Sequence, residues 1–202
     1  MPAVETSALL AAIRALSEDE DTRARIDDEI RRRGHLLPDW LVHLAGASAY
    51  RAVETVHPQG DGENVLVGVR LPGEHELTAL VFVDHNLGTV AKDGFVVDRP
   101  VAEIAEELDL ISDSDTGCHD IPLAEARARL QEAVSHGARI FPPFESETWP
   151  TSRPLVEWIA RALPDGGTGY VRPDWPDDQL ADLTRRFFAS SYGRPWSDHR
   201  EL

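Results

Sequence analysis

The sequence predicts an α+β fold, in which helices cover an antiparallel β-meander of about four strands and an N-terminal helical annex precedes the sheet. Three observations support this prediction. Apolar residues recur at helical spacing near both ends of the chain, and they alternate at strand spacing in the middle. The middle segments are joined by short turns, which require antiparallel neighbours because a parallel crossover needs about a dozen residues or more.

The annex is expected over residues 1–46. Its first helix, 6–16, carries apolar residues at helical spacing, and its second, 20–33, is mostly polar and ends at Gly34. A short amphipathic stretch over 38–44 leads into the core.

The core is expected over residues 47–163 and begins with segments rich in Val, Leu and Phe. These predicted strands are 49–57, 64–71, 76–83 and 89–97. The third is apolar on both faces, which indicates an internal strand that helices cover on both sides.

Helical periodicity returns in the second half of the chain. The predicted helices are 100–109, 122–136, 153–163 and 177–190, and Asp98, Asp120 and Ser152 are expected to cap the first three. The last helix belongs to a segment, 164–202, that begins with a linker rich in Gly and Pro.

Charge and cysteine content restrict the possible partners. The 202 residues include 20 Lys and Arg against 36 Asp and Glu, a formal net charge of −16. Such a surface repels phosphates, so the sequence argues against nucleic-acid binding, and no apolar run is long enough to cross a membrane. The single cysteine, Cys118, cannot form an intramolecular disulfide, and cytoplasm is the expected location. Cys118 and His119 are soft ligand types, but neighbouring loop residues rarely face one site, and Asp120 is expected to be a helix cap.

The first candidate site is the turn that follows the third strand. Asp84, His85 and Asn86 end that strand, and Lys92 and Asp93 lie on the returning strand. A carboxylate, an imidazole and an amine at this spacing predict proton transfer or oxyanion binding by Asp84, His85, Lys92 and Asp93, with Asn86 as a binding residue. The alternative interpretation is ordinary turn formation together with a solvated ion pair.

The second candidate site is the aromatic and proline-rich loop over 141–153. In an extended segment Glu145 and Glu147 point to the same side, so with Asp84 they could bind a divalent cation through oxygen. We also expect Glu145, Trp149 and Arg153 to bind a partner, with Trp149 as the anchor. The alternative is a rigid loop that packs on the sheet and leaves its glutamates in solvent.

Both loops carry a family resemblance. At Val83–Gly88 with Lys92 and Asp93, and again in the segment from Phe141 to Trp158, the sequence resembles a family of actinobacterial hypothetical proteins of unknown function. The similarity runs from about residue 64 to the C-terminus, and longer members continue into a further helical region. The resemblance implies a shared fold and transfers no activity or catalytic residue.

These observations predict a cytoplasmic interaction or ligand-binding module that binds a protein or a small molecule through 84–93 and 141–153. The alternative is a metal-assisted hydrolase. There Asp84, Glu145 and Glu147 would hold the cation, His85 would act as acid or base, and Lys92 or Arg153 would stabilise an anion. A third interpretation, suggested by the charge alone, is an acidic mimic of nucleic acid.

Overall fold

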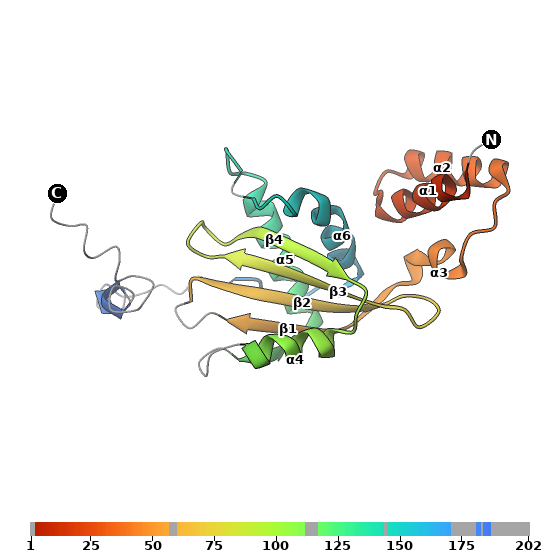
Figure 1. The fold of residues 1–202 in the computed structure, drawn as a ribbon. Helices are drawn as coiled ribbons and strands as arrows, with labels where there is room; N and C mark the ends of the chain where they lie inside the picture. Colours follow the sequence, from red (N-terminus) through yellow and green to blue (C-terminus); the bar gives the residue numbers. More distant parts are fainter. Residues whose placement is uncertain are drawn as a thin grey trace. The chain divides into compact units, whose positions relative to one another are not determined.

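A five-stranded antiparallel sheet with the order β4-β3-β2-β1-β5 forms the centre of the protein in the computed structural model (Figure 1). The structure describes residues 3–56, 60–111, 117–143, 145–170, 181–182 and 184–186. The strands are β1 (Ser48–Val56), β2 (Gly62–Arg70), β3 (Glu76–Asp84), β4 (Val90–Val97) and β5 (Cys118–Ile121). The predicted α+β fold is confirmed, with one strand more than expected.

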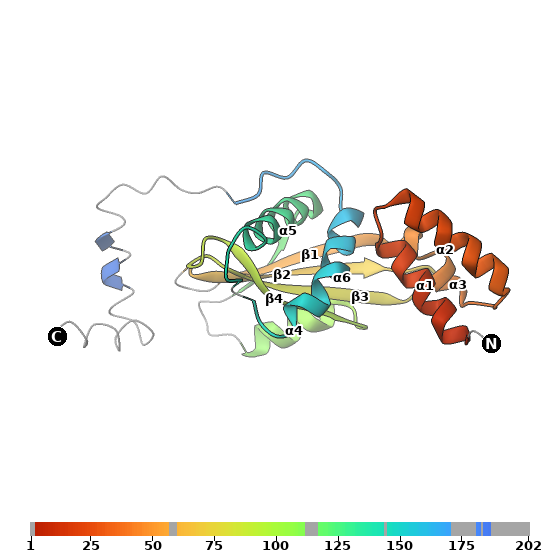
Figure 2. The same cartoon turned by 90° about the horizontal axis from the view of Figure 1, so that it is seen from above.

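Helices precede and follow the meander. They are α1 (Val4–Leu16), α2 (Glu20–Arg33), α3 (Asp39–Val42), α4 (Val101–Ile111), α5 (Leu123–Gly137) and α6 (Trp149–Ala162), and a 3-10 turn, Leu44–Gly46, follows α3. Figures 1 and 2 show α4 on one face of the sheet and α5 and α6 on the other. Among the described residues, none of the helices has the length and apolar character that a membrane crossing requires.

The additional strand, β5, lies where a loop and a helix cap were predicted. Cys118 pairs with Thr55 and Ile121 pairs with Ala52, so β5 extends the sheet beside β1. The cap prediction for Asp120 is wrong, because its carboxylate binds Arg51 at 2.7 Å and Pro122 occupies the N-cap position of α5. A strand of four residues is too short to show a clear alternation, and its partner is distant in the sequence.

The face under α4 is held by apolar packing. Val53 and Leu66 of the sheet are buried against Val101, Ile104 and Ala105 of α4. The helix approaches the sheet closely at Gly68, where an added Cβ would lie 2.6 Å from Val101 Cγ1.

The opposite face packs against α5 and α6. Alternating residues of β2 and β3 are completely buried there, namely Val65, Val67, Ala79, Val81 and Val83. On the α4 face, Leu80 and Phe82 of β3 stay half-buried, because the contact with α4 centres on Val53 and Leu66 of β1 and β2. The third predicted strand is therefore internal, as expected, but it is fully covered on one face only.

Helix α6 begins earlier than predicted. It starts at Trp149 with Thr148 at the N-cap, and the hydroxyl of the predicted cap, Ser152, donates to the Thr148 carbonyl at 3.2 Å. Trp149 is 2% exposed, and its ring lies over Gly94, where an added Cβ would be 2.9 Å from Trp149 Cζ3. Burial of this indole explains why the helix begins before the predicted residue 153.

The chain after α6 packs on α5 instead of forming a free linker. Thr168 N donates to Glu125 Oε2 at 3.0 Å. A Cβ at Gly167 would lie 2.1 Å from the carbonyl oxygen of Ala124, so only glycine fits this approach. The predicted linker is thus part of the folded core at least as far as Gly169.

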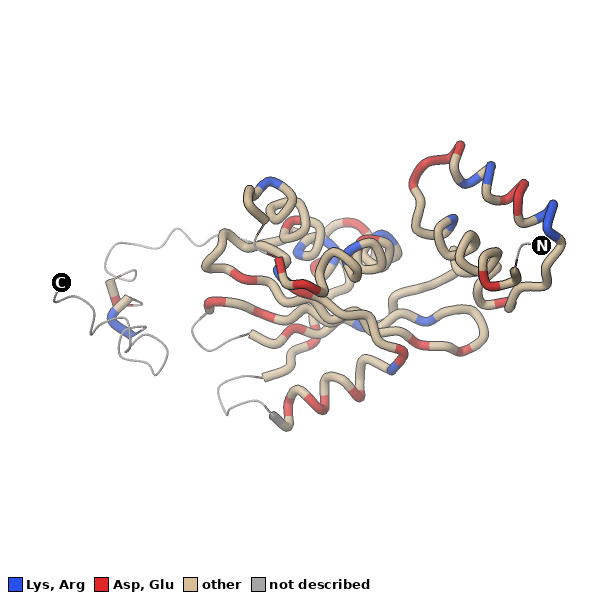
Figure 3. Tube along the Cα trace, turned by 45° about the horizontal axis from the view of Figure 1, so that its top comes forward, with Lys and Arg blue, Asp and Glu red and all other residues tan. Residues whose placement is uncertain are grey.

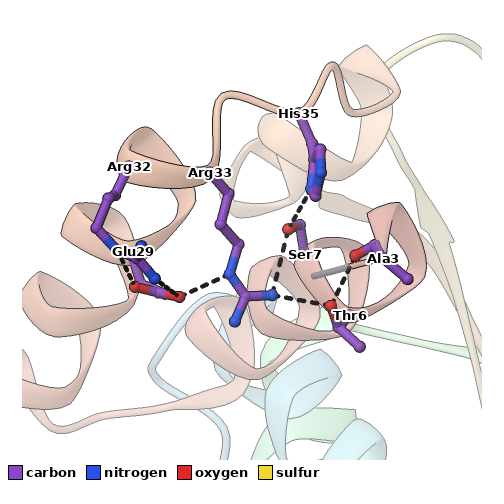
Figure 4. A network of polar contacts seen from close by, with 7 residues as sticks. All are labelled: Ala3, Thr6, Ser7, Glu29, Arg32, Arg33 and His35. Atoms are coloured by element: carbon purple, nitrogen blue, oxygen red, sulfur yellow. Dashed lines mark hydrogen bonds and ion pairs between the residues drawn. The ribbon is translucent and has the colours of Figure 1, made fainter. Parts of the chain in front are cut away.

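The annex is a helical hairpin tied by polar contacts. Arg14 pairs with Asp27 across α1 and α2, and Ser7 Oγ lies 2.8 Å from His35 Nδ1 (Figure 4). Arg161 of α6 holds the annex to the core, because it donates to the Leu16 carbonyl at 2.9 Å.

The chain divides into two compact units, Met1–Gly169 and Tyr170–Leu202. The annex predicted over 1–46 and the core predicted over 47–163 lie in the first unit. The helix predicted over 177–190 lies mostly outside the described residues, although 181–182 and 184–186 are helical.

Candidate functional site

The two loops singled out in the sequence meet at the outer edge of β4. Ser146 N donates to the Lys92 carbonyl at 2.9 Å. Asp93 Oδ1 accepts hydrogen bonds from Ser146 Oγ at 2.5 Å and from Thr148 Oγ1. We call residues 84–93 together with 140–143 and 145–148 the rim surface.

A bulge in β4 determines how the turn side chains are placed. Phe82 pairs with Asp93 and Val83 pairs with Ala91, so Lys92 has no Cα partner in the β3–β4 ladder. Lys92 Nζ reaches back across the turn and donates to Asp84 Oδ2 at 3.0 Å. The sequence therefore predicted the proximity of these two residues correctly.

Asp84 also shapes the turn itself. Its Oδ1 accepts a hydrogen bond from Leu87 N at 3.2 Å, and the residue is buried. With one oxygen on a backbone amide and the other on Lys92, the carboxylate matches the turn-forming interpretation better than a catalytic one.

His85 lies half-buried between the turn and β2. Its Nδ1 is 3.3 Å from Thr89 Oγ1, and its Nε2 is 3.8 Å from Glu63 Oε2. Its backbone N–H donates to the Asp61 carbonyl at 2.9 Å. The imidazole thus has a carboxylate neighbour, but that neighbour is Glu63 and not the Asp84 of the predicted site.

Asp93 anchors the second loop. Burial acts to raise the pKa of its carboxyl group, but hydrogen bonds from Ser146, Thr148 and the Gly94 amide outweigh it and lower the pKa. All three hydrogen bonds favour the ionised carboxylate, which links β4 to the start of α6. We call this link the Asp93 clasp.

An ionic cluster that the sequence analysis missed lies beneath α5 near the same turn. Arg129 contacts Glu54 of β1, and its guanidinium is 3.5 Å from Glu63 of β2 and 3.3 Å from Glu125. Burial opposes the charge of Arg129, but the three carboxylates outweigh it and raise its pKa. The cluster fixes α5 on the sheet, and its members are too far apart in the sequence to form a motif.

The predicted cation ligands do not assemble. In the part of the chain that the structure describes, no three His, Cys, Asp or Glu side chains come together to hold a metal ion, so the set Asp84, Glu145 and Glu147 is not brought together. Asp84 is already neutralised by the ammonium group of Lys92, which would repel a cation. Glu147 is exposed, as the rigid-loop alternative predicts, whereas Glu145 is half-buried.

The remaining predicted binding residues separate in space. Trp149 cannot anchor a partner, because its indole is buried against the sheet. Arg153 pairs with Glu157 at 2.8 Å and lines a hollow between α5 and α6 instead of joining the turn. Asn86 is exposed at the tip of the turn and remains available to a partner.

The annex contains a further pair that resembles a nucleophile and its base. Ser7 Oγ is within hydrogen-bonding distance of His35 Nδ1, and Arg33 Nη1 lies 3.5 Å from the same oxygen (Figure 4). Ser7 is completely buried, so a substrate cannot reach its hydroxyl. The pair is a structural contact between α1 and the chain that follows α2.

Comparison of the chain with protein-family models, curated proteins and solved structures finds no match. The resemblance to the actinobacterial family stays a prediction, and function is argued from the geometry of the site.

Proposed function

We propose that the protein is a cytoplasmic interaction module that binds a protein partner through the rim surface. The observation that supports this proposal is the exposure of Phe141. Its side chain is 94% exposed, although it lies in a segment whose two ends are fastened to the same strand region.

Specific polar contacts attach both ends of the segment that contains Phe141. At one end His136 Nδ1 lies 3.2 Å from the Thr89 carbonyl, and at the other Ser146 N donates to the carbonyl of Lys92. Between these contacts the described residues of the loop project beyond the sheet (Figure 1). A large aromatic side chain that is held outside the core in this way costs solvation free energy, which contact with a partner would recover.

Polar side chains of the rim surface are also accessible. Asn86 at the turn is exposed and Lys92 is half-buried, so both can bind a partner at the margin of the contact. An apolar centre with a polar border is the usual composition of a protein interface. The hydrolase interpretation is not favoured, because its three cation ligands do not come together.

The proposal is tested by affinity capture from an extract of the cells that produce the protein, with Phe141→Ser as the variant. We expect at least one protein to be captured by the wild type and lost with this variant, because the aromatic anchor carries most of the contact energy. Leu36→Ser is the matched control, since Leu36 is equally exposed but lies in the annex, and it should retain the same protein.

Circular dichroism must show that both variants fold like the wild type. Capture of the same proteins by wild type and Phe141→Ser, or no specific capture by the wild type, would contradict the proposal.

A further inference from the structure

A hollow of about 390 Å³ lies between the annex and α6, and its lining includes no residue of the rim surface. Its lining combines apolar and charged side chains, including Ala15, Leu44, Trp158, Glu18, Arg23 and Arg161. We call it the annex hollow. A volume of this size suits a small molecule, and binding sites often form where two parts of a fold meet.

The two arginines of the annex hollow are less exposed than their carboxylate partners. Arg161 is 33% exposed and bonded to the Leu16 carbonyl, whereas its ionic partner Glu18 is 73% exposed. Arg23 is 41% exposed and lies 3.6 Å from Glu20, which is 92% exposed. Pairs with such exposed carboxylates are weak, so a competing anion can displace either glutamate.

The two arginines lie in a chain with a net charge of −16. Figure 3 shows Lys and Arg interleaved with Asp and Glu on the annex and around α5 and α6, whereas α4 carries acidic residues without Lys or Arg. The annex hollow thus brings two positive side chains together in a protein whose net negative charge repels anions at long range. An anionic ligand would therefore gain its binding free energy from direct contacts in the hollow and not from long-range attraction.

The lining defines the ligand further. A guanidinium group binds a carboxylate or a phosphate through paired hydrogen bonds. Trp158, Leu44 and Ala15 add apolar surface beside the arginines, which an ion without carbon cannot use.

We propose that the annex hollow binds a small organic anion, in which a carboxylate or phosphate group replaces Glu18 and Glu20 on Arg161 and Arg23 and an apolar body contacts Trp158. This site is independent of the rim surface, so each proposal can fail without the other.

The test is a calorimetric titration of the full chain with phenyl phosphate, benzoate and inorganic phosphate. We expect both aromatic probes to bind and inorganic phosphate to bind at least about tenfold more weakly, because it lacks the apolar body. Equal binding of phenyl phosphate and inorganic phosphate, or no binding of either aromatic probe, would overturn the proposal.

Substitutions then locate the site. Arg23→Gln should weaken phenyl phosphate about tenfold, since it removes a charge-assisted bond. Glu18→Gln should strengthen binding severalfold, because it removes the carboxylate that competes for Arg161. Arg25→Gln is the matched control, since Arg25 lies exposed on the same helix outside the lining, and it should leave the affinity unchanged.

Whether Glu18→Gln raises or lowers the affinity for phenyl phosphate distinguishes binding in the annex hollow from binding elsewhere on the surface. Weaker binding by Glu18→Gln, or equal losses in Arg23→Gln and Arg25→Gln, would assign the binding elsewhere and contradict the proposal.

Discussion

The two faces of the sheet are joined to their helices by different interactions. Under α4 the contact is apolar, with Val53 and Leu66 buried against Val101. Under α5 and α6 an apolar centre is bordered at one end by Arg129 and its carboxylates and at the β4 edge by the Asp93 clasp.

This difference shows which contacts determine the positions of the helices on the sheet. Apolar burial is non-directional and tolerates small shifts of a helix, whereas the Arg129 cluster requires β1, β2 and α5 to be in register. The α4 face therefore contributes mainly stability, and the ionic border of the other face determines how α5 is placed beside the turn and the rim surface.

The largest loss of stability is expected from a cavity in the apolar contact between the sheet and α4. Leu66→Ala should lower the free energy of unfolding by about 4 kcal/mol, because it leaves a cavity under α4 where the side chain is completely buried. Urea unfolding at two pH values measures the loss, which should be the same at both. Leu110→Ala, an exposed position on the same helix, should change stability by less than about 0.5 kcal/mol. Similar losses for the two variants would show that α4 is not packed on Leu66.

A somewhat smaller loss is expected from the ionic border. Arg129→Met should cost about 3 kcal/mol near neutral pH, because Glu54 and Glu63 stay largely buried without their cation. Unlike the Leu66 effect, this loss should shrink as the pH is lowered, because protonation removes the negative charge that Arg129 balances. Adding Glu54→Gln and Glu63→Gln to Arg129→Met should restore most of the stability. A loss that does not depend on pH would mean that packing and not charge holds α5 here.

The smallest effect concerns the clasp at the β4 edge. Asp93→Asn should lower the free energy of unfolding by about 1–2 kcal/mol at neutral pH, because the amide accepts the Ser146 and Thr148 hydrogen bonds less strongly. The folded-state pKa of Asp93 lies below its ordinary value of 3.8, so its contribution is present above that pH and is lost as the pH falls through the folded-state value.

Acid unfolding curves of wild type and Asp93→Asn should therefore converge at low pH. A constant difference down to the acid limit would show that the ionisation of Asp93 does not stabilise the clasp.

The sequence predicted those elements that leave a local pattern of apolar residues. Alternation located the four meander strands, and helical spacing located the helices that cover them, because burial on one face leaves a period in the chain. It also placed Lys92 near Asp84, since a short turn brings the two strand ends together.

What the sequence could not supply depends on contacts between distant positions. β5 exists because four residues pair with β1, and α6 begins at Trp149 because its indole fills the space over Gly94. The Arg129 cluster joins residues from β1, β2 and α5, which no spacing rule connects. For the same reason the aromatic side chain expected to meet a partner was Trp149, which is buried, whereas Phe141 of the same loop is exposed.

The bulge at Lys92 has a consequence for the behaviour of the protein at high concentration. β4 is an outer strand, and its row of backbone groups is interrupted where Lys92 leaves the ladder and Ser146 occupies its carbonyl. The strand at the other margin, β5, has only four residues. As far as the structure describes them, neither margin offers a long uninterrupted template, so sheets of neighbouring molecules cannot readily join into fibrils.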